Sequence, residues 1–156
     1  MDEITFRPIT DADADFLLRV YSSTRTEELA MMPWTEEQKA AFCRMQFHAQ
    51  HTHYQQHYSQ ASFDIMERGG QAIGRLYVDR TARGLEIIDI TLLPEFRRAG
   101  LGTKLLRDLQ EEARAAGKPL WIYVEKFNPA LRLYQRLGFR ETEDAGVYLR
   151  MAWQAE

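Results

Sequence analysis

The stretch IIDITLLPEFRRAGLGTKLLRDL, residues 87–109, gives the clearest indication of the fold. It begins with apolar and β-branched residues, is interrupted at Pro94, and continues through a basic loop that contains Gly100 and Gly102. It ends in a segment whose leucines fall on one face of a helix. The first turn of a helix leaves backbone N–H groups without partners and its dipole favours negative charge. The sequence therefore predicts a strand, a phosphate-binding loop and a helix, in that order.

Two common phosphate-binding motifs do not fit this loop. A dinucleotide fingerprint G-x-G-x-x-G that starts at Gly100 needs a glycine at position 105, where the chain has Leu105. A P-loop needs Gly-Lys followed by Ser or Thr, whereas the order here is Gly102-Thr103-Lys104. The loop is therefore expected to bind a phosphate ligand of another kind.

Composition and charge narrow the class of protein. The chain has 156 residues, of which 45% are hydrophobic and 28% charged, so we expect a single globular domain over residues 1–156. A formal net charge of -3 argues against a dedicated nucleic-acid binder. No segment approaches the roughly 18 apolar residues of a membrane helix, and the acidic first residues do not resemble a signal peptide. With Cys43 as the only cysteine, we expect a cytoplasmic protein without a disulfide and without a membrane or nucleic-acid partner.

Periodicity and turn signals predict the order of elements. A capping box at Thr35, a Gly69-Gly70 hairpin signal and a C-cap at Gly117 mark element ends, and Asn128 with Pro129 is expected to open the last helix. Strands are expected at residues 3–9, 62–68, 71–79, 85–93, 120–124, 139–143 and 147–153, and helices at 10–28, 35–56, 101–116 and 128–137. The order β-α-α-β-β-β-α-β-α-β-β predicts an α/β (α+β) fold, with a mixed sheet that has helices on both faces.

Two blocks of this chain resemble the GCN5-related N-acetyltransferase (GNAT) superfamily. The run RRAGLG at residues 97–102 fits the R/Q-x-x-G-x-G/A signature of that family, and NPALRLYQRLGF at residues 128–139 is similar to its second recurring block. The pair of blocks is far more specific than the signature alone, and the order of elements extends the resemblance over essentially the whole chain. The resemblance implies a GNAT-like, mostly antiparallel sheet with a splayed parallel strand pair in its centre.

By this resemblance the cofactor is acetyl-CoA, acting as acyl donor. The backbone after the central strand would hold its pyrophosphate, and the end of that strand would hold its pantetheine arm. Asn128 would contact the cofactor, cap a helix, or do both. The expected cofactor-binding residues are Leu92, Leu93, Arg97, Arg98, Ala99, Gly100, Leu101, Gly102, Thr103 and Asn128.

The family's chemistry needs an acid near the sulfur and a base near the amine. Tyr134 matches the position of the family's acid, and its phenol is a reasonable proton donor to a thiolate. For the base, Glu86 matches the glutamate of the histone-acetylating branch, Asp89 lies on the same strand, and a water chain is a further option. Because Glu86 and Asp89 have opposite parity along the strand, only one of them is expected to face the cleft.

The helix expected at residues 35–56 belongs to the acceptor side of the family. Phe47, His51, Tyr54 and Tyr58 fall on one helical face. They either line an acceptor pocket, with His51 as an alternative base, or only pack. No cysteine or carboxylate completes a metal-ligand set with the histidines, so no metal is expected.

The function expected from the resemblance is direct acetyl transfer to a primary amine in a ternary complex. The acceptor would be a small molecule or a peptide, and a homodimer is one expectation because members of the family are often dimers. Two alternatives stay open: a non-catalytic acyl-CoA-binding sensor or interaction domain on the same fold, and transfer of a different acyl group.

Overall fold

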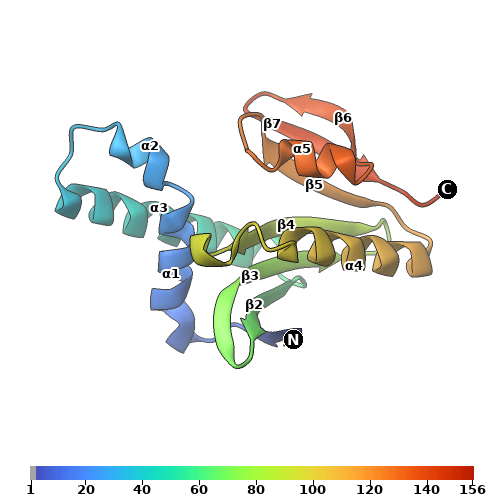
Figure 1. Ribbon diagram of the computed structural model, residues 1–156, viewed down its shortest axis with the longest axis horizontal. Helices are drawn as coiled ribbons and strands as arrows, with labels where there is room; N and C mark the ends of the chain where they lie inside the picture. The colour runs from blue at the N-terminus through green and yellow to red at the C-terminus, as the bar shows by residue number, and fades with distance from the viewer. Residues whose placement is uncertain (1–2) are drawn as a thin grey trace.

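A seven-stranded sheet in the order β1-β2-β3-β4-β5-β7-β6 forms the centre of the computed structural model, which describes residues 3–156 (Figure 1). Only β4 and β5 pair in parallel, and the other neighbours are antiparallel. The strands are β1 (Ile4–Pro8), β2 (Ser62–Arg68), β3 (Gln71–Arg80), β4 (Leu85–Leu92), β5 (Leu120–Glu125), β6 (Arg140–Ala145) and β7 (Tyr148–Trp153). The helices are α1 (Ala14–Ser23), α2 (Thr26–Ala30), α3 (Glu36–His57), α4 (Leu101–Ala116) and α5 (Leu131–Arg136). The predicted fold class is confirmed.

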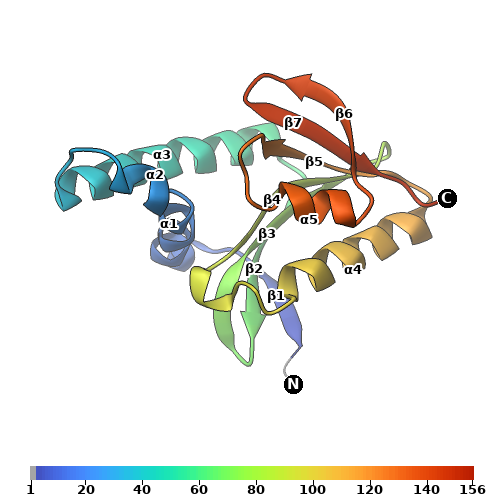
Figure 2. The same ribbon diagram turned by 45° about the horizontal axis from the view of Figure 1, so that its top comes forward.

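Helices bury an apolar cluster on each face of the sheet (Figures 1 and 2). On one face, α4 contributes Leu105, Leu106 and Leu109 to the larger cluster, which also contains Tyr134 of α5. On the other face, Leu17 and Tyr21 of α1 meet Phe47 of α3 and Ile65 of β2. The two faces of the sheet are therefore covered by different helices, α4 and α5 on one and α1 and α3 on the other.

The parallel pair β4–β5 separates along its length. The strands pair only where residues 85–87 lie beside residues 120–122, although β4 continues to Leu92 and β5 to Glu125. Figure 2 shows the two strands diverging beyond that point. The splayed pair that the resemblance implied is thus present, and it leaves one edge of β4 without a strand partner.

A β-bulge in β4 corrects the expected parity of two carboxylates. Opposite β3, Tyr77 pairs with Asp89 but Val78 pairs with Ile87, so Ile88 is an extra residue on β4. One extra residue shifts the alternation of side chains by one position. Glu86 and Asp89 therefore both face α3, as their contacts below show, and the expectation that only one of them faces the cleft was wrong.

The first predicted helix, residues 10–28, is in fact two helices, α1 and α2. Three polar side chains compete with the helical pattern at the break, because Ser23 Oγ donates to the Val20 carbonyl at 2.7 Å and Thr24 Oγ1 donates to the Tyr21 carbonyl at 2.6 Å, while Thr26 Oγ1 donates to the Ser22 carbonyl at 3.3 Å. Such side-chain bonds to the backbone offer an alternative to the helical ladder.

The start of the last helix also differs from the prediction. Asn128 Oδ1 accepts the Ala130 N–H at 2.8 Å, which forms a turn, and α5 begins at Leu131 with Ala130 as its N-cap. Asn128 is therefore not the helix N-cap and Pro129 is not its first residue.

Other turn signals were read correctly. Thr35 Oγ1 accepts the Gln38 N–H at 3.1 Å and Gln38 Oε1 accepts the Thr35 N–H at 2.9 Å, which is the expected capping box of α3. Gly117 ends α4 with a φ of 67°. None of the helices built by residues 3–156 is long and apolar enough to cross a membrane.

Candidate active site

The loop between β4 and α4 presents a continuous row of free backbone donors. Within residues 3–156, the N–H groups of residues 98–103 donate no hydrogen bond. Arg98 and Gly100 have positive φ angles of 65° and 78°, and no side chain caps the helix at Gly100. Six adjacent amides at the start of a 16-residue helix make a strong anion-binding concavity.

The two arginines of this loop differ in their contacts. Arg97 turns back along the chain, where its Nε donates to the Leu92 carbonyl at 2.9 Å and its Nη2 lies 3.4 Å from Ser23 Oγ. The exposed side chain of Arg98 forms no hydrogen bond or ion pair with the rest of the described chain. Arg98 is therefore the guanidinium that is free to approach an anion on the loop.

The open edge of β4 carries backbone groups of Ile90 and Leu92. Leu93 donates its N–H to the Ile73 carbonyl of β3 at 2.9 Å, so the Leu93 amide faces the sheet. Because backbone groups alternate between the two edges of a strand, those of Ile90 and Leu92 face the splay. The bond from Arg97 to the Leu92 carbonyl agrees with this direction.

Tyr134 of α5 lies in the larger core cluster, and only 5% of it is exposed. Its ring meets Phe139 edge-on at a centroid distance of 5.7 Å, and its hydroxyl has no hydrogen-bond partner within residues 3–156. Burial, and secondly the negative charge of Asp89, raise the pKa of Tyr134 above its ordinary value. The phenol is therefore held in its protonated form and faces the charge of a residue on β4.

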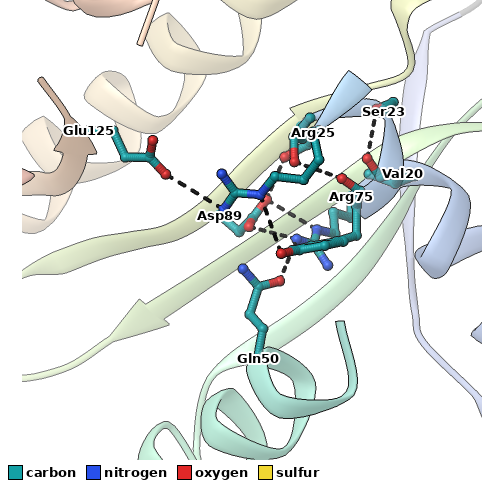
Figure 3. Close-up of polar contacts among 10 residues, drawn as sticks. Val20, Ser23, Arg25, Gln50, Arg75, Asp89 and Glu125 are labelled. Carbon is teal, nitrogen blue, oxygen red and sulfur yellow. Dashed lines mark hydrogen bonds and ion pairs between the residues drawn. The ribbon is translucent and has the colours of Figure 1, made fainter. Parts of the chain in front are cut away.

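Asp89 is fixed in a buried polar cluster (Figure 3). Arg75 Nε donates to Asp89 Oδ1 at 3.1 Å and Arg75 Nη2 donates to Asp89 Oδ2 at 2.8 Å. Asp89 Oδ1 also accepts from Thr91 Oγ1 at 2.6 Å, and Arg75 Nη2 donates to Gln50 Oε1 of α3 at 2.9 Å. Both oxygens of Asp89 are thus engaged, one of them twice.

Glu86 has a simpler environment. Its Oε2 accepts the Tyr58 hydroxyl at 2.6 Å, just beyond the end of α3, and it forms no ion pair with any described cation. Burial, together with the hydrogen bond to Glu86, raises the pKa of Tyr58. Of the two carboxylates, Asp89 and Glu86, only Glu86 therefore has an oxygen that accepts no hydrogen bond from a described residue.

The face of α3 toward the sheet is aromatic, as the spacing predicted, but its members differ in access. Phe47 is 7% exposed and packs in the core beside Tyr21, so a ligand does not reach it without moving its neighbours. His51 and Tyr54 are half-buried, and burial lowers the pKa of His51, which favours the neutral ring. Tyr54 meets Tyr77 of β3 edge-on at 6.0 Å.

One buried hydroxyl on this face is left without a partner. Tyr77 is completely buried, and its hydroxyl forms no hydrogen bond within the described chain. The guanidinium carbon of Arg75 lies 5.1 Å from the centre of the Tyr77 ring. A buried hydroxyl without a hydrogen-bond partner destabilises the folded state. This side of the sheet is therefore polar, and one of its polar groups lacks a hydrogen bond.

A weak ion pair joins the two sides of the splay (Figure 3). Arg25, between α1 and α2, approaches Glu125 at the end of β5, with Nη2 and Oε1 3.7 Å apart. The same guanidinium donates from Nε to the Tyr21 hydroxyl at 3.3 Å and lies 5.5 Å above the Tyr21 ring. Figure 3 shows the Arg25 side chain extending toward Glu125, so the helical layer makes a contact with the end of β5.

Sequence reasoning did not find several residues of this site, namely Arg25, Gln50, Arg75, Thr91 and Glu125. Arg75 interrupts an otherwise apolar strand, which was an available signal for a buried charge that needs a partner. The others belong to ordinary polar positions and gave no signal. The residues that the structure describes include no group of three or more His, Cys, Asp or Glu side chains placed to hold a metal ion.

A sequence model of the acetyltransferase (GNAT) family matches residues 22–139. The chain belongs to this family. An uncharacterised N-acetyltransferase from Methanocaldococcus jannaschii is 41% identical over 69 residues, covering 42% of this chain and 30% of that protein. An acetyltransferase from Agrobacterium fabrum is 39% identical over 71 residues, covering 44% of this chain and 51% of that one. The match thus spans about half or less of the length of these curated relatives.

Solved structures of the GNAT family share the fold. The PaiA N-acetyltransferase of Thermoplasma acidophilum, crystallised with coenzyme A, aligns with a TM-score of 0.72 over 98% of this chain and 99% of that one, at 19% identity. The family resemblance read from the two sequence blocks is thereby confirmed.

Proposed function

We propose that this GNAT protein transfers an acetyl group from acetyl-CoA to a primary amine, directly and in a ternary complex. The observation that carries the proposal is the row of six unpartnered amides at residues 98–103, next to the open edge of β4 and followed by a buried, protonated Tyr134. A pyrophosphate fits a helix N-terminus of this kind. The coenzyme A in the related T. acidophilum structure is consistent with this ligand.

The donor would bind mainly through the backbone. The amides of residues 98–103 would hold the pyrophosphate, with the Arg98 guanidinium beside it. The pantetheine amides would bond to the open edge of β4, at Ile90 and Leu92, as an added strand does. The Leu92 carbonyl already accepts a hydrogen bond from Arg97, so a bond from pantetheine to that oxygen would require Arg97 to move. Asn128 Oδ1 already accepts the Ala130 N–H within the turn before α5, so Asn128 would act by stabilising the conformation of that loop.

The transfer step needs one proton removed and one supplied. The neutral amine nitrogen attacks the thioester carbonyl carbon, a C–N bond forms, and the nitrogen, now positively charged, loses one proton to the base or to water. The C–S bond breaks as the thiolate leaves with its electron pair. Tyr134 would donate a proton or a hydrogen bond to that sulfur, and its raised pKa keeps the donor form present at neutral pH. Its hydroxyl is free of other partners among residues 3–156, which suits this task.

Glu86 is the favoured candidate for the base, acting directly or through water. An ammonium must lose a proton before it can attack, and Glu86 keeps a carboxylate oxygen available. Asp89, whose two oxygens are held by Arg75 and Thr91, is poorly placed to accept a proton. Burial lowers the pKa of His51 and so favours the form that can accept a proton, but His51 lies beside Phe47 on the helix rather than on β4.

The acceptor would lie against the face shared by α3, Glu86 and the end of β5. Family relatives with named substrates include a glucosamine 6-phosphate N-acetyltransferase from Trypanosoma brucei brucei, so a small-molecule amine is within the range of the family. The proposed acceptor is a primary amine of a small molecule or a peptide.

The test measures free thiol released from acetyl-CoA in the presence of polyamines, amino acids, aminoglycosides and peptide N-termini, alongside thermal unfolding with and without coenzyme A. We expect coenzyme A to raise the melting temperature and at least one amine to give thiol release in proportion to N-acetyl product. Stabilisation without turnover on any amine would instead indicate an acyl-CoA sensor. Absence of both effects would contradict acyl-CoA binding altogether.

A further inference from the structure

We propose that Arg75 is a positioning residue for acetyl transfer, because it fixes Asp89 on β4 and Gln50 on α3 in one buried arrangement and so sets the acceptor-side helix against the reaction strand. The inference rests on the proposed function for its kinetic consequence. The link between α3 and β4, from Gln50 through Arg75 to Asp89, does not depend on the proposed function, because it consists of hydrogen bonds between described residues.

Arg75 and its partner Asp89 form a buried ion pair. The side chain of Arg75 is 2% exposed and that of Asp89 is 12% exposed. Burying an ion pair contributes little net stability compared with apolar residues of the same volume. A buried guanidinium instead fixes the orientation of its partner, because its planar set of N–H donors binds a carboxylate in one geometry. Nε and Nη2 hold the two oxygens of Asp89, and Nη2 reaches Gln50 in addition.

Beyond its middle, α3 is weakly anchored. Only Cys43 and Phe47 are buried among the 22 residues of α3, and both lie before Gln50. The second half of the helix therefore has no fully buried side chain, and its ring contacts with the sheet come from the half-buried Tyr54. Three polar or aromatic contacts join this part of the helix and its C-cap to the sheet, those of Gln50 with Arg75, Tyr54 with Tyr77 and Tyr58 with Glu86. Of these three contacts, only the one between Gln50 and Arg75 involves a fully buried charged group, the Arg75 guanidinium.

Asp89 lies between the two halves of the reaction. It lies on β4 beside the bulge, opposite Tyr77, and its negative charge contributes, after burial, to the raised pKa of Tyr134. The polar and charged groups that face it come from four elements, namely Arg75 and Tyr77 of β3, Thr91 of β4, Gln50 and Tyr54 of α3, and Tyr134 of α5. Arg75 is the cation among them. A displacement of this pair would therefore move both the acceptor-side helix and the charge near the proton donor.

The kinetic test compares Gln50→Leu and Arg75→Lys with the wild type. Gln50→Leu removes only the bond to α3, and Arg75→Lys keeps the positive charge beside Asp89 but loses the planar fork. We expect kcat to fall roughly 10-fold in Gln50→Leu and on the order of 100-fold in Arg75→Lys, as small displacements at a reaction centre do. The Kd for coenzyme A should stay within about 3-fold, because the free amides of residues 98–103 lie outside the cluster.

Arg80→Lys is the matched control. Arg80 lies on the same strand and also forms two hydrogen bonds to one carboxylate, Glu112 of α4, but its side chain is 42% exposed. We expect wild-type kcat and Kd for this variant. Equal losses of kcat in Arg80→Lys and Arg75→Lys would overturn the inference, as would wild-type kcat in both Gln50→Leu and Arg75→Lys.

A second readout does not depend on activity. Amide hydrogen exchange of residues 50–57 should become at least 10-fold faster in Gln50→Leu and Arg75→Lys, while α4 keeps its protection. If the wild type binds coenzyme A but acetylates no amine, the proposed function fails and this exchange measurement still decides whether Arg75 ties α3 to the sheet. Unchanged exchange in residues 50–57 of both variants would overturn the tie.

Discussion

The proposed donor side and the proposed acceptor side of this molecule are built in different ways. The donor side is made of backbone groups that follow one another in the chain, from the open edge of β4 to the first turn of α4. The acceptor side is made of side chains from α3, β3 and β4 that meet only in the folded protein, such as Gln50, Arg75 and Asp89. A backbone site tolerates changes of side chain except where a Cβ would obstruct the ligand, whereas a side-chain site depends on each residue.

This contrast makes different positions sensitive on the two sides. On the donor side the sensitive positions are glycines, and on the acceptor side they are the members of the polar cluster. Substitutions at these positions test whether the two sides can be changed separately.

The substitution Gly100→Glu should abolish coenzyme A binding. A Cβ at Gly100 would meet no atom within 4 Å, so the side chain has room, although the φ of 78° strains any residue but glycine; its charge would lie in the proposed pyrophosphate site. Gly117→Glu is the control, because Gly117 also has a positive φ and free space and lies at the other end of α4. Calorimetric titration should show no binding in the first variant and wild-type affinity in the second. Similar affinities in both would place the anion site elsewhere.

The substitution Tyr134→Phe should lower kcat on the order of 100-fold, since general acid catalysis contributes about this much or more. The ring still packs against Phe139, so the Kd for coenzyme A should change little. Because the pKa of Tyr134 is raised, its deprotonation should cause no loss of wild-type rate below its ordinary pKa of about 10. Steady-state kinetics from pH 6 to 10 check both points. A comparable loss of coenzyme A affinity would mean that the role of Tyr134 is structural.

The two carboxylates of β4 should differ in their effect on stability. Asp89→Asn leaves Arg75 buried without its counter-charge and should lower the free energy of unfolding by about 3 kcal/mol. Glu86→Gln keeps an oxygen for the Tyr58 hydroxyl and should cost less than about 1 kcal/mol, while it lowers kcat if Glu86 is the base. Urea unfolding and thiol-release assays measure the two effects. Equal destabilisation by both substitutions would contradict the distinction drawn between them.

The smallest effect concerns acid stability on the helical side. Hydrogen bonds from Arg7 lower the pKa of Asp13 from 3.8 to about 2. The folded-state value lies below the unfolded one, so the stabilisation is present above pH 4 and is lost as the pH falls through 2. Because Arg7 is 39% exposed, we expect only about 1–2 kcal/mol.

Asp13→Asn should therefore be less stable than the wild type at pH 6 and about equally stable near pH 2, with unchanged affinity for coenzyme A at pH 6. Urea unfolding followed by circular dichroism at the two pH values measures the difference. A difference that stays constant between pH 6 and pH 2 would show that the ion pair does not cause it.

The same contrast explains what could be predicted from the sequence. The donor loop, its helix and the turns at Gly117 and Thr35 follow from local rules, so their positions were predicted within a few residues. The bulge at Ile88 was not foreseen, because no residue type marks it, and it reversed the inferred direction of Asp89 relative to Glu86. Gln50 and Arg75 are 25 positions apart in the chain, and no local pattern indicates that they meet.

The most direct test of the account follows the backbone amides of the donor loop by NMR while coenzyme A is added. Glycine amides usually lie in a distinct region of the spectrum, and Gly100 and Gly102 belong to the row of free donors, whereas Gly117 and Gly146 lie elsewhere in the fold. We predict large shifts of the Gly100 and Gly102 amides, with Gly117 and Gly146 nearly unchanged. Shifts that leave residues 98–103 unaffected while coenzyme A binds would contradict the assignment of this loop as the donor site.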